Sequence, residues 1–295
     1  MKLTWPTGRG SWGAISAAVC AAVLLLAGSP ASAQIAGTKH NLGSGSTQTP
    51  RATDTAEICV FCHTPHGADV TTVNAPPLWN KRLATGAVYT TYASLNTPSL
   101  DGEILPVGST SVACLSCHDG TQAMDNIINA PGTGGYDATG GGAGGLTYTW
   151  LGAATTGVMP SGVANLTSNL SDDHPIGIQY CGGGITGAAG AVAGTCRDTD
   201  FVRDATRLRT ASLNGNQTFW IETGATADGF RTRTDLPLYT RTFVAGGAGP
   251  SVECGSCHDP HVAAGQAGPN AQVAGATFLR ISNASSAVCT ACHVK

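Results

Sequence analysis

The chain has 295 residues, with 18 acidic and 15 basic residues and a formal net charge of −3. Its basic residues are few and unclustered, which argues against nucleic acid as a partner. The 40 glycines and the low aromatic content, 6% of residues, leave little side-chain surface for a large core. Glycine adds no packing surface and loses the most conformational entropy on folding.

The first segment has the features of a secretory signal peptide. Lys2 and Arg9 precede an apolar run over residues 14–27, which is followed by the small-residue sequence SPASA. The run is too short, and its flanks are wrong, for a helix that spans a bilayer. We therefore predict that residues 1–33 are removed on export. The mature chain 34–295 would then have a net charge of −5 and no membrane span.

The mature chain divides into three segments by its cysteine distribution. Residues 34–130 and 251–295 each contain two Cys-x-x-Cys-His motifs, and residues 131–250 contain none. The middle segment opens with PGTGGYDATGGGAGG, which is typical of a loop. Later in it, LTYTW, QTFWIET and FRTRTDLPLYTRTF predict a few short antiparallel strands, because they are rich in β-branched and aromatic residues. Short helices are expected around AEICVFC, SVACLSC and SSAVCTAC, although no run shows sustained helical periodicity.

Eight cysteines form four copies of one pattern, numbered here motifs 1 to 4. The copies are Cys59, Cys62 and His63; Cys114, Cys117 and His118; Cys254, Cys257 and His258; and Cys289, Cys292 and His293. The pattern is typical of c-type haem attachment. Two thiols one helical turn apart can form thioethers with the two vinyl groups of one porphyrin, and the imidazole that follows reaches the iron. Zinc ribbons and disulfides also use such cysteine pairs, but neither needs a histidine after every pair. We therefore predict four covalently bound haem c groups, with the four motif histidines as proximal iron ligands.

Four haems have four second axial positions on their irons, and the chain has four histidines outside the motifs. They are the distal candidates His40, His66, His174 and His261. Met124 and Met159, the methionines of the mature chain, lie in ordinary apolar contexts where packing is expected. Ligation by two histidines implies low reduction potentials and leaves no position on the iron for a substrate. This favours electron transfer over catalysis.

His66 and His261 cannot close the irons of their own motifs. Each lies three residues after a proximal histidine, His63 or His258, and the second axial position is across the porphyrin plane. Each must therefore serve another haem, if it serves any. A segment of this kind would hold two haems near contact, as fast electron transfer requires.

Cys181 and Cys196 are the mature cysteines outside the motifs. In an exported chain, such a pair flanking a glycine-rich loop predicts a disulfide, with two free thiols as the alternative. Nearby arginines could pair with haem propionates, although a solvated face is the expected role for them. They are Arg197, Arg203, Arg207 and Arg209.

Several of these segments together resemble a known family. CVFCHTPHG, SDDHPIG, PLYTRTF…VECGSCHDPH and FLRISNASSAVCTACH are similar to segments of the doubled-CxxCH multihaem cytochromes, specifically the outer-surface tetrahaem cytochromes of the OmcE type that polymerise into conductive nanowires. The likeness covers residues 58–120, 172–180 and 236–295. The glycine-rich stretches 131–160 and 181–200 match no pattern.

The resemblance implies four stacked bis-histidine haems, in subunits of an extracellular filament. It also implies a location outside the cell or at its surface rather than in the periplasm. In such filaments a histidine of one subunit can ligate a haem of the next subunit. His40, near the mature N-terminus, is the candidate for this role and would bind a haem of another copy of this chain.

The expected fold is therefore a multihaem cytochrome c: mostly irregular chain, few short helices and a small antiparallel β element, with the haems forming the core. The expected function is electron transfer in a filament. The alternatives are a soluble monomeric periplasmic tetrahaem shuttle and a multihaem reductase, which would need an open iron position. The electron donor and acceptor are not identified by the sequence.

Overall fold

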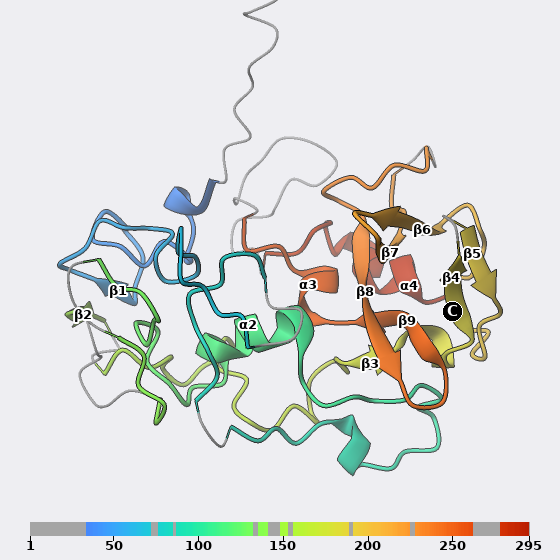
Figure 1. The fold of residues 1–295 in the computed structure, drawn as a ribbon, viewed down its shortest axis with the longest axis horizontal. Coiled ribbons are helices and arrows are strands. Elements are labelled where there is room, and N and C mark those ends of the chain that lie inside the picture. The colour runs from blue at the N-terminus through green and yellow to red at the C-terminus, as the bar shows by residue number, and fades with distance from the viewer. Residues whose placement is uncertain are drawn as a thin grey trace, which may run out of the picture. The chain divides into compact units, whose positions relative to one another are not determined.

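The computed structural model describes residues 34–71, 76–84, 87–131, 135–140, 148–152, 156–188, 191–224, 228–261 and 278–294. The predicted signal segment, 1–33, and much of the predicted loop at 131–145 lie outside the described residues. Residues 34–295 belong to one compact unit. This unit consists mostly of strands and irregular chain with a few short helices (Figure 1). Within the described ranges, no helix is both long enough and apolar enough to cross a membrane.

The largest regular element is a five-stranded antiparallel sheet with strand order β3-β9-β8-β7-β6 (Figure 1). Its strands are β3 (Ile178–Gln179), β6 (Leu208–Leu213), β7 (Asn216–Ile221), β8 (Leu236–Phe243) and β9 (Gly247–Val252). The strands predicted in QTFWIET and FRTRTDLPLYTRTF correspond to β7 and β8. Strand β9 crosses residue 250, where the border between the second and third segments was predicted, so those two segments share one sheet.

Asn214 and Gly215 close the hairpin between β6 and β7. Both residues have positive φ angles, 50° and 79°, and Leu213 pairs with Asn216 across them. Asn-Gly is the favoured pair for a two-residue turn in which both residues are left-handed. Strand β6 was not expected from its composition, and this Asn-Gly pair is the signal that could have located it.

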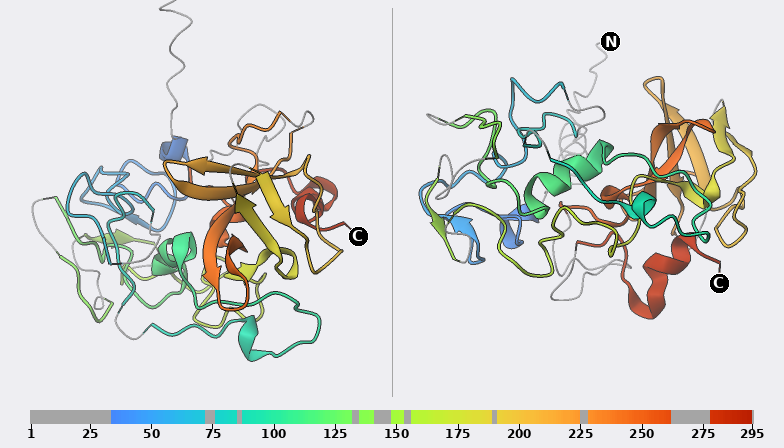
Figure 2. Two further views of the ribbon diagram at one scale, coloured as in Figure 1. Left: turned by 45° about the vertical axis from the view of Figure 1, so that its right-hand side comes forward. Right: turned by 90° about the horizontal axis from the view of Figure 1, so that it is seen from below.

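The remaining elements are short (Figure 2). Two small antiparallel pairs join β1 (Arg51–Ala52) to β2 (Trp150–Leu151) and β4 (Ile185–Ala188) to β5 (Ala191–Gly194). The α-helices are α2 (Ser109–His118), α3 (Cys254–Cys257) and α4 (Ala287–Cys292), and the 3-10 turns are η1 (Gln34–Gly37), η2 (Tyr92–Ser94), η3 (Tyr180–Gly182) and η4 (Ala284–Ser286). Helices α2 and α4 correspond to those predicted around SVACLSC and SSAVCTAC.

The helix predicted around AEICVFC does not form, and motif 1 is a single turn. The backbone N–H groups of Cys62 and His63 both donate to the Cys59 carbonyl, at 3.0 and 2.7 Å. The neighbouring carbonyls are bound by another segment. The Asn80 side chain donates to the Val60 carbonyl at 2.7 Å, and the Asn80 backbone donates to the Cys62 carbonyl at 2.9 Å. Because these acceptors are occupied, the turn does not continue into a helix.

Two clusters of buried apolar side chains form beside the motifs. The first packs the sheet against α4, and its members include Tyr180, Leu208, Phe219, Ile221 and Leu236. The second surrounds Phe61 and includes Leu42, Met124, Ile127 and Trp150, with Met159 packed against it. Met124 and Met159 therefore pack as predicted. Cys292 borders the first cluster, and Cys62 and Cys117 border the second.

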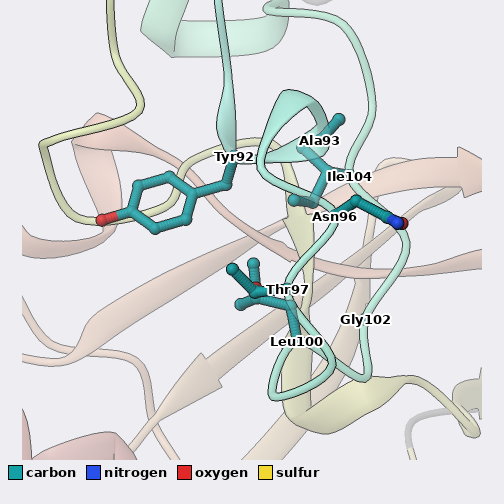
Figure 3. A pocket seen from close by; sticks show the side chains of 7 residues that line it. All are labelled: Tyr92, Ala93, Asn96, Thr97, Leu100, Gly102 and Ile104. Atoms are coloured by element: carbon teal, nitrogen blue, oxygen red, sulfur yellow. The ribbon is translucent and has the colours of Figure 1, made fainter.

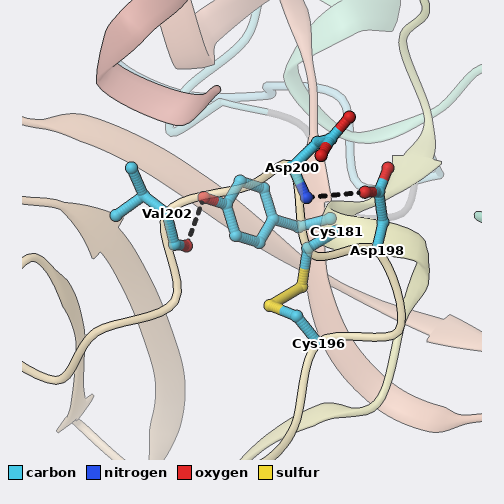
Figure 4. The surroundings of a disulfide bond; sticks show 6 residues. Cys181, Cys196, Asp198, Asp200 and Val202 are labelled. Atoms are coloured by element: carbon cyan, nitrogen blue, oxygen red, sulfur yellow. Dashed lines mark hydrogen bonds between the residues drawn. A yellow bond between two sulfur atoms is a disulfide. The ribbon is translucent and has the colours of Figure 1, made fainter. Parts of the chain in front are cut away.

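Cys181 and Cys196 form a disulfide, which confirms that prediction (Figure 4). The bond closes a loop with a sequence separation of 15 residues around the β4–β5 hairpin. Beside it, the Tyr180 hydroxyl donates to the Val202 carbonyl at 2.7 Å. Both cysteines belong to the cluster that also contains Ala291 of α4. The disulfide thus ties the glycine-rich loop to the part of the core that borders motif 4.

The double substitution Cys181→Ala and Cys196→Ala should lower the free energy of unfolding by about 3 kcal/mol, because the unfolded chain regains the freedom of a loop of this length. Chemical denaturation of the mature protein measures the change. A thiol reductant should destabilise the wild type to the same extent and leave the variant unaffected. An unchanged denaturation midpoint would contradict the prediction.

Candidate functional site

The eight motif cysteines have free thiols in the structure. Cys59 and Cys289 are exposed, and the other six are half-buried. No motif has used its two thiols in a disulfide, so every pair remains available for thioether bonds. Among the described residues, no group of three or more His, Cys, Asp or Glu side chains converges as a site for a bare metal ion.

Motifs 1, 2 and 3 adjoin one another in sequence order. Burial, together with the charge of the nearby Cys117, raises the pKa of Cys62 to about 12. Cys114 of motif 2 shares a hydrogen bond with Cys254 of motif 3, which raises the pKa of Cys114 and lowers that of Cys254. Motif 2 therefore lies close to both neighbouring motifs, and its Cys114 is influenced by Cys254 of motif 3 and by Cys62 of motif 1.

Motif 4 adjoins motif 3. Burial raises the pKa of Cys257, and the charges of Cys254 and Cys289 raise it further. Burial also raises the pKa of Cys292 to about 12, with a contribution from Cys257. The attachment cysteines thus form one continuous row from motif 1 to motif 4.

A buried carboxylate, that of Glu253, joins motifs 2 and 3. One oxygen accepts a hydrogen bond from the Ser111 hydroxyl of α2 at 2.5 Å, and the other accepts from Arg241 of β8 at 2.7 Å. The Cys254 backbone N–H donates to the same Ser111 hydroxyl at 3.0 Å. Glu253 also caps the N-terminus of α3. Burial raises the pKa of Glu253, and its bonds to Ser111 and Arg241 oppose the rise.

Two proximal histidines are oriented by backbone carbonyls. Nδ1 of His63 lies 2.9 Å from the Pro77 carbonyl, and Nδ1 of His118 lies 2.6 Å from the Ala164 carbonyl. A carbonyl can only accept, so Nδ1 is the donor and the neutral ring keeps its lone pair on Nε2. Histidine ligands of metals are commonly held in this way. Both rings therefore fit the predicted role of iron ligand.

The distal candidate His261 has the same kind of support. Its Nδ1 lies 3.2 Å from a carboxylate oxygen of Asp259. Burial alone would raise the pKa of Asp259, but hydrogen bonds from the side chain and backbone of His261 lower it to about 2. Asp259 is therefore ionised at neutral pH and accepts the Nδ1 hydrogen, which leaves Nε2 of His261 free for a metal.

The structure brings two distal candidates close to proximal histidines. The ring centres of His63 and His261 are 6.2 Å apart, and those of His118 and His40 are 6.1 Å apart. A metal–imidazole bond of about 2.0 Å and a ring radius of about 1.15 Å place two imidazoles on opposite sides of one ion about 6.3 Å apart, centre to centre. Both separations match this value. His261 thus lies beside the proximal histidine of another motif, as the axial geometry requires.

His40 lies within its own chain's site. Its ring stacks on Phe278 with centres 4.2 Å apart. Burial, and then the charge of His118, lower the pKa of His40 to about 4, so the imidazole is neutral at neutral pH. A neutral ring is the form that binds a metal. The arrangement favours ligation opposite His118 of the same chain over the intermolecular role expected for His40.

The remaining predicted ligands are less defined. His66 and His174 are exposed, and Nδ1 of His174 lies 3.0 Å from the Pro175 carbonyl. The contacts of the described residues do not assign either histidine to a particular motif. The ring of His293 packs on Phe201, with centres 4.4 Å apart. His258 lies at the C-terminus of α3, where its backbone pairs with Leu279.

The arginines after the disulfide have different roles. Arg209 pairs with Glu222 at 3.0 Å on the sheet. Arg207 donates to the Ala291 carbonyl of α4 at 3.1 Å, which places its charge beside motif 4. Arg197 and Arg203 are exposed, as a solvated face predicts.

One shallow pocket of about 160 Å³ lies in the loop around η2 (Figure 3). Its lining comes from residues 92–104 and includes Tyr92, Asn96 and Leu100. It contains none of the predicted haem residues, so it plays no part in the site.

No family model matches the chain, and a search of curated proteins finds no match. The motifs, their arrangement and the resemblance of the motif segments are therefore the grounds for a functional assignment.

The two histidine pairs differ in the angle between their ring planes, which is 20° for His63 and His261 and 83° for His118 and His40. Near-parallel axial imidazoles give a rhombic low-spin electron paramagnetic resonance signal, whereas near-perpendicular ones give a signal with a much larger highest g value. We expect both signals in the oxidised, haem-loaded protein. His261→Ala should remove a rhombic signal, and His40→Ala should remove a large-g signal.

His66→Ala serves as the control and should leave the signals of these two haems unchanged. Loss of the same type of signal in both the His261 and the His40 variants would contradict the assigned pairs.

Proposed function

We propose that the chain is a tetrahaem c-type cytochrome that transfers electrons and is not an enzyme. The observation that supports this most strongly is the continuous row of attachment cysteines, in which Cys62 adjoins Cys117, Cys114 adjoins Cys254, and Cys257 adjoins Cys289. The covalently bound haems would supply irons that each accept and release one electron. Consecutive motifs adjoin, and the pair His63 with His261 also brings motif 1 beside motif 3. Electrons would therefore pass between haems that are held by neighbouring motifs.

The protein's own residues would hold and enclose the four groups. Each cysteine pair would attach one haem, and its histidine would bind the iron through Nε2. The pairs His63 with His261 and His118 with His40 would occupy both axial positions of the haems on motifs 1 and 2. An iron with two protein ligands offers no position to a substrate, which is why electron transfer is favoured over a reductase. His66 and His174 remain the distal candidates for motifs 3 and 4.

The further part of the proposal is assembly into an extracellular filament at the cell surface. It rests on the resemblance of the motif segments to the OmcE-type cytochromes. The second candidate, a soluble monomeric periplasmic shuttle, is favoured by one observation. His40, the residue expected to link two copies, faces His118 of its own chain at 6.1 Å between ring centres.

Haem stoichiometry tests the electron-transfer proposal. The mature protein, produced with a c-type maturation system, should contain four haems by pyridine haemochrome assay and intact mass. Replacing both cysteines of any one motif by alanine should remove one haem. The matched control is Cys181→Ala with Cys196→Ala, which makes the same chemical change at the disulfide and should keep four haems. Full loading of a motif variant, or fewer than four haems in the wild type, would refute the proposal.

The assembly state separates the two candidate functions. We expect electron microscopy of cell-surface material to show filaments that contain this chain, with subunits close enough for the haem row to continue. A chain recovered from the periplasm as a monomer at high concentration, with four low-spin haems, would establish the shuttle instead.

A further inference from the structure

Lys81 is a fully buried lysine next to motif 1. The residue has 0% of its surface exposed. Its Nζ donates to three backbone carbonyls that follow motif 2: those of Ala123, Met124 and Asn126, at 3.1, 2.9 and 3.3 Å. Lysines are almost never buried to this extent, so the position calls for a role beyond packing.

The geometry requires that Lys81 is charged. A carbonyl oxygen only accepts hydrogen bonds, so three carbonyl partners need three N–H donors on Nζ. An ammonium group has three, whereas a neutral amine has two. All three donors are occupied by the chain, which leaves none for a carboxylate or a haem propionate. Lys81 is therefore a fixed positive charge in the interior.

This charge lies close to the attachment cysteine Cys62. The residue before it, Asn80, bonds the carbonyls of Val60 and Cys62, at 2.7 and 2.9 Å. His63 pairs with Trp79 in an antiparallel bridge, and its Nδ1 lies 2.9 Å from the Pro77 carbonyl. Met124, whose carbonyl binds Lys81, belongs to the apolar cluster that Cys62 borders. The segment that ends at Lys81 thus runs alongside motif 1.

In the described part of the chain, the charged groups near Lys81 include Arg82 with its partner Asp69, and Asp125. Arg82 pairs with Asp69 at 3.3 Å, and its side chain is 38% exposed, so solvent and partner both weaken its field. Asp125 is buried between two of the residues whose carbonyls bind Lys81, and it accepts a hydrogen bond from the Tyr148 backbone at 2.9 Å. Asp125 opposes the field of Lys81, but Asp125 is present with and without Lys81, so its charge does not alter the difference that removal of Lys81 makes.

We propose that Lys81 raises the reduction potential of the haem attached to Cys59 and Cys62, an inference that rests on the proposed function. Adding an electron to the iron lowers the charge of the site by one, so a nearby cation stabilises the reduced state. The charge is buried, where the effective dielectric constant is low and salt screens little. The haem on motif 1 would therefore hold its electron more tightly than it would in a protein without Lys81.

The test compares Lys81→Gln and Lys81→Met with Lys39→Met. Glutamine removes the charge but keeps two N–H donors that can bond the carbonyls, whereas methionine removes both the charge and the donors. Lys39 is exposed, and its substitution changes the net charge by the same amount at the surface. Potentiometric titration of the haem absorbance gives the midpoints. The midpoint of the motif 1 haem is identified as the one that is missing from the titration of the Cys59→Ala, Cys62→Ala variant.

We expect the motif 1 midpoint to shift to lower potential in both Lys81 variants, to remain shifted at high salt, and to stay unchanged in Lys39→Met. With four haems bound, an unshifted midpoint in Lys81→Gln, or an equal shift in Lys39→Met, would overturn the inference alone. Loss of the motif 1 haem from Lys81→Gln would assign Lys81 a structural role and also overturn it. A wild type that binds no haem would overturn the proposed function and this inference together.

Discussion

The buried carboxylate of Glu253 is the interaction on which the arrangement of the motifs most depends. A buried charge is costly unless it is paired and hydrogen-bonded, and Glu253 meets this requirement by drawing on α2 through Ser111 and on β8 through Arg241. It also caps α3, the helix that begins with Cys254. One side chain therefore fixes the sheet, motif 2 and motif 3 relative to one another, although the two motifs are separated by about half of the chain.

The histidines show the same dependence on distant partners. The acceptors that orient His63 and His118 are carbonyls of Pro77 and Ala164, which follow them in the chain by 14 and 46 residues. His261 is oriented locally by Asp259, but the ring it faces belongs to motif 1. His63 is thus oriented by one contact and brought near its predicted partner, His261, by others. This pair can form only when segments from both ends of the chain have come together, whereas His40 and His118 both lie in the first half of the chain.

The sequence was sufficient for features that depend on local chemistry. The disulfide between Cys181 and Cys196, strands β7 and β8, and the packing of Met124 were predicted and are found. The helix around Cys59 was predicted but is replaced by a turn, because Asn80 binds the carbonyls that a helix would need. Which histidine faces which motif could not be predicted, since that depends on how the irregular chain returns to itself. The presence of haem remains a prediction from the motifs.

Buried amides explain how so irregular a chain can hold fixed positions. Asn80, Gln122 and Asn126 each have 0% of their surface exposed. Their side chains bond backbone groups of other loops, as when Asn80 donates to Val60 and Asn129, and Gln122 donates to Arg82 and Ser116. Buried backbone groups need partners, and where strands and helices are short, side chains must supply them. Around motifs 1 and 2 these amides supply the hydrogen-bond partners that a helix or sheet gives backbone groups elsewhere. The Lys81 ammonium also binds backbone carbonyls in this region. Lys81 therefore both binds the loop after motif 2 and carries a buried positive charge.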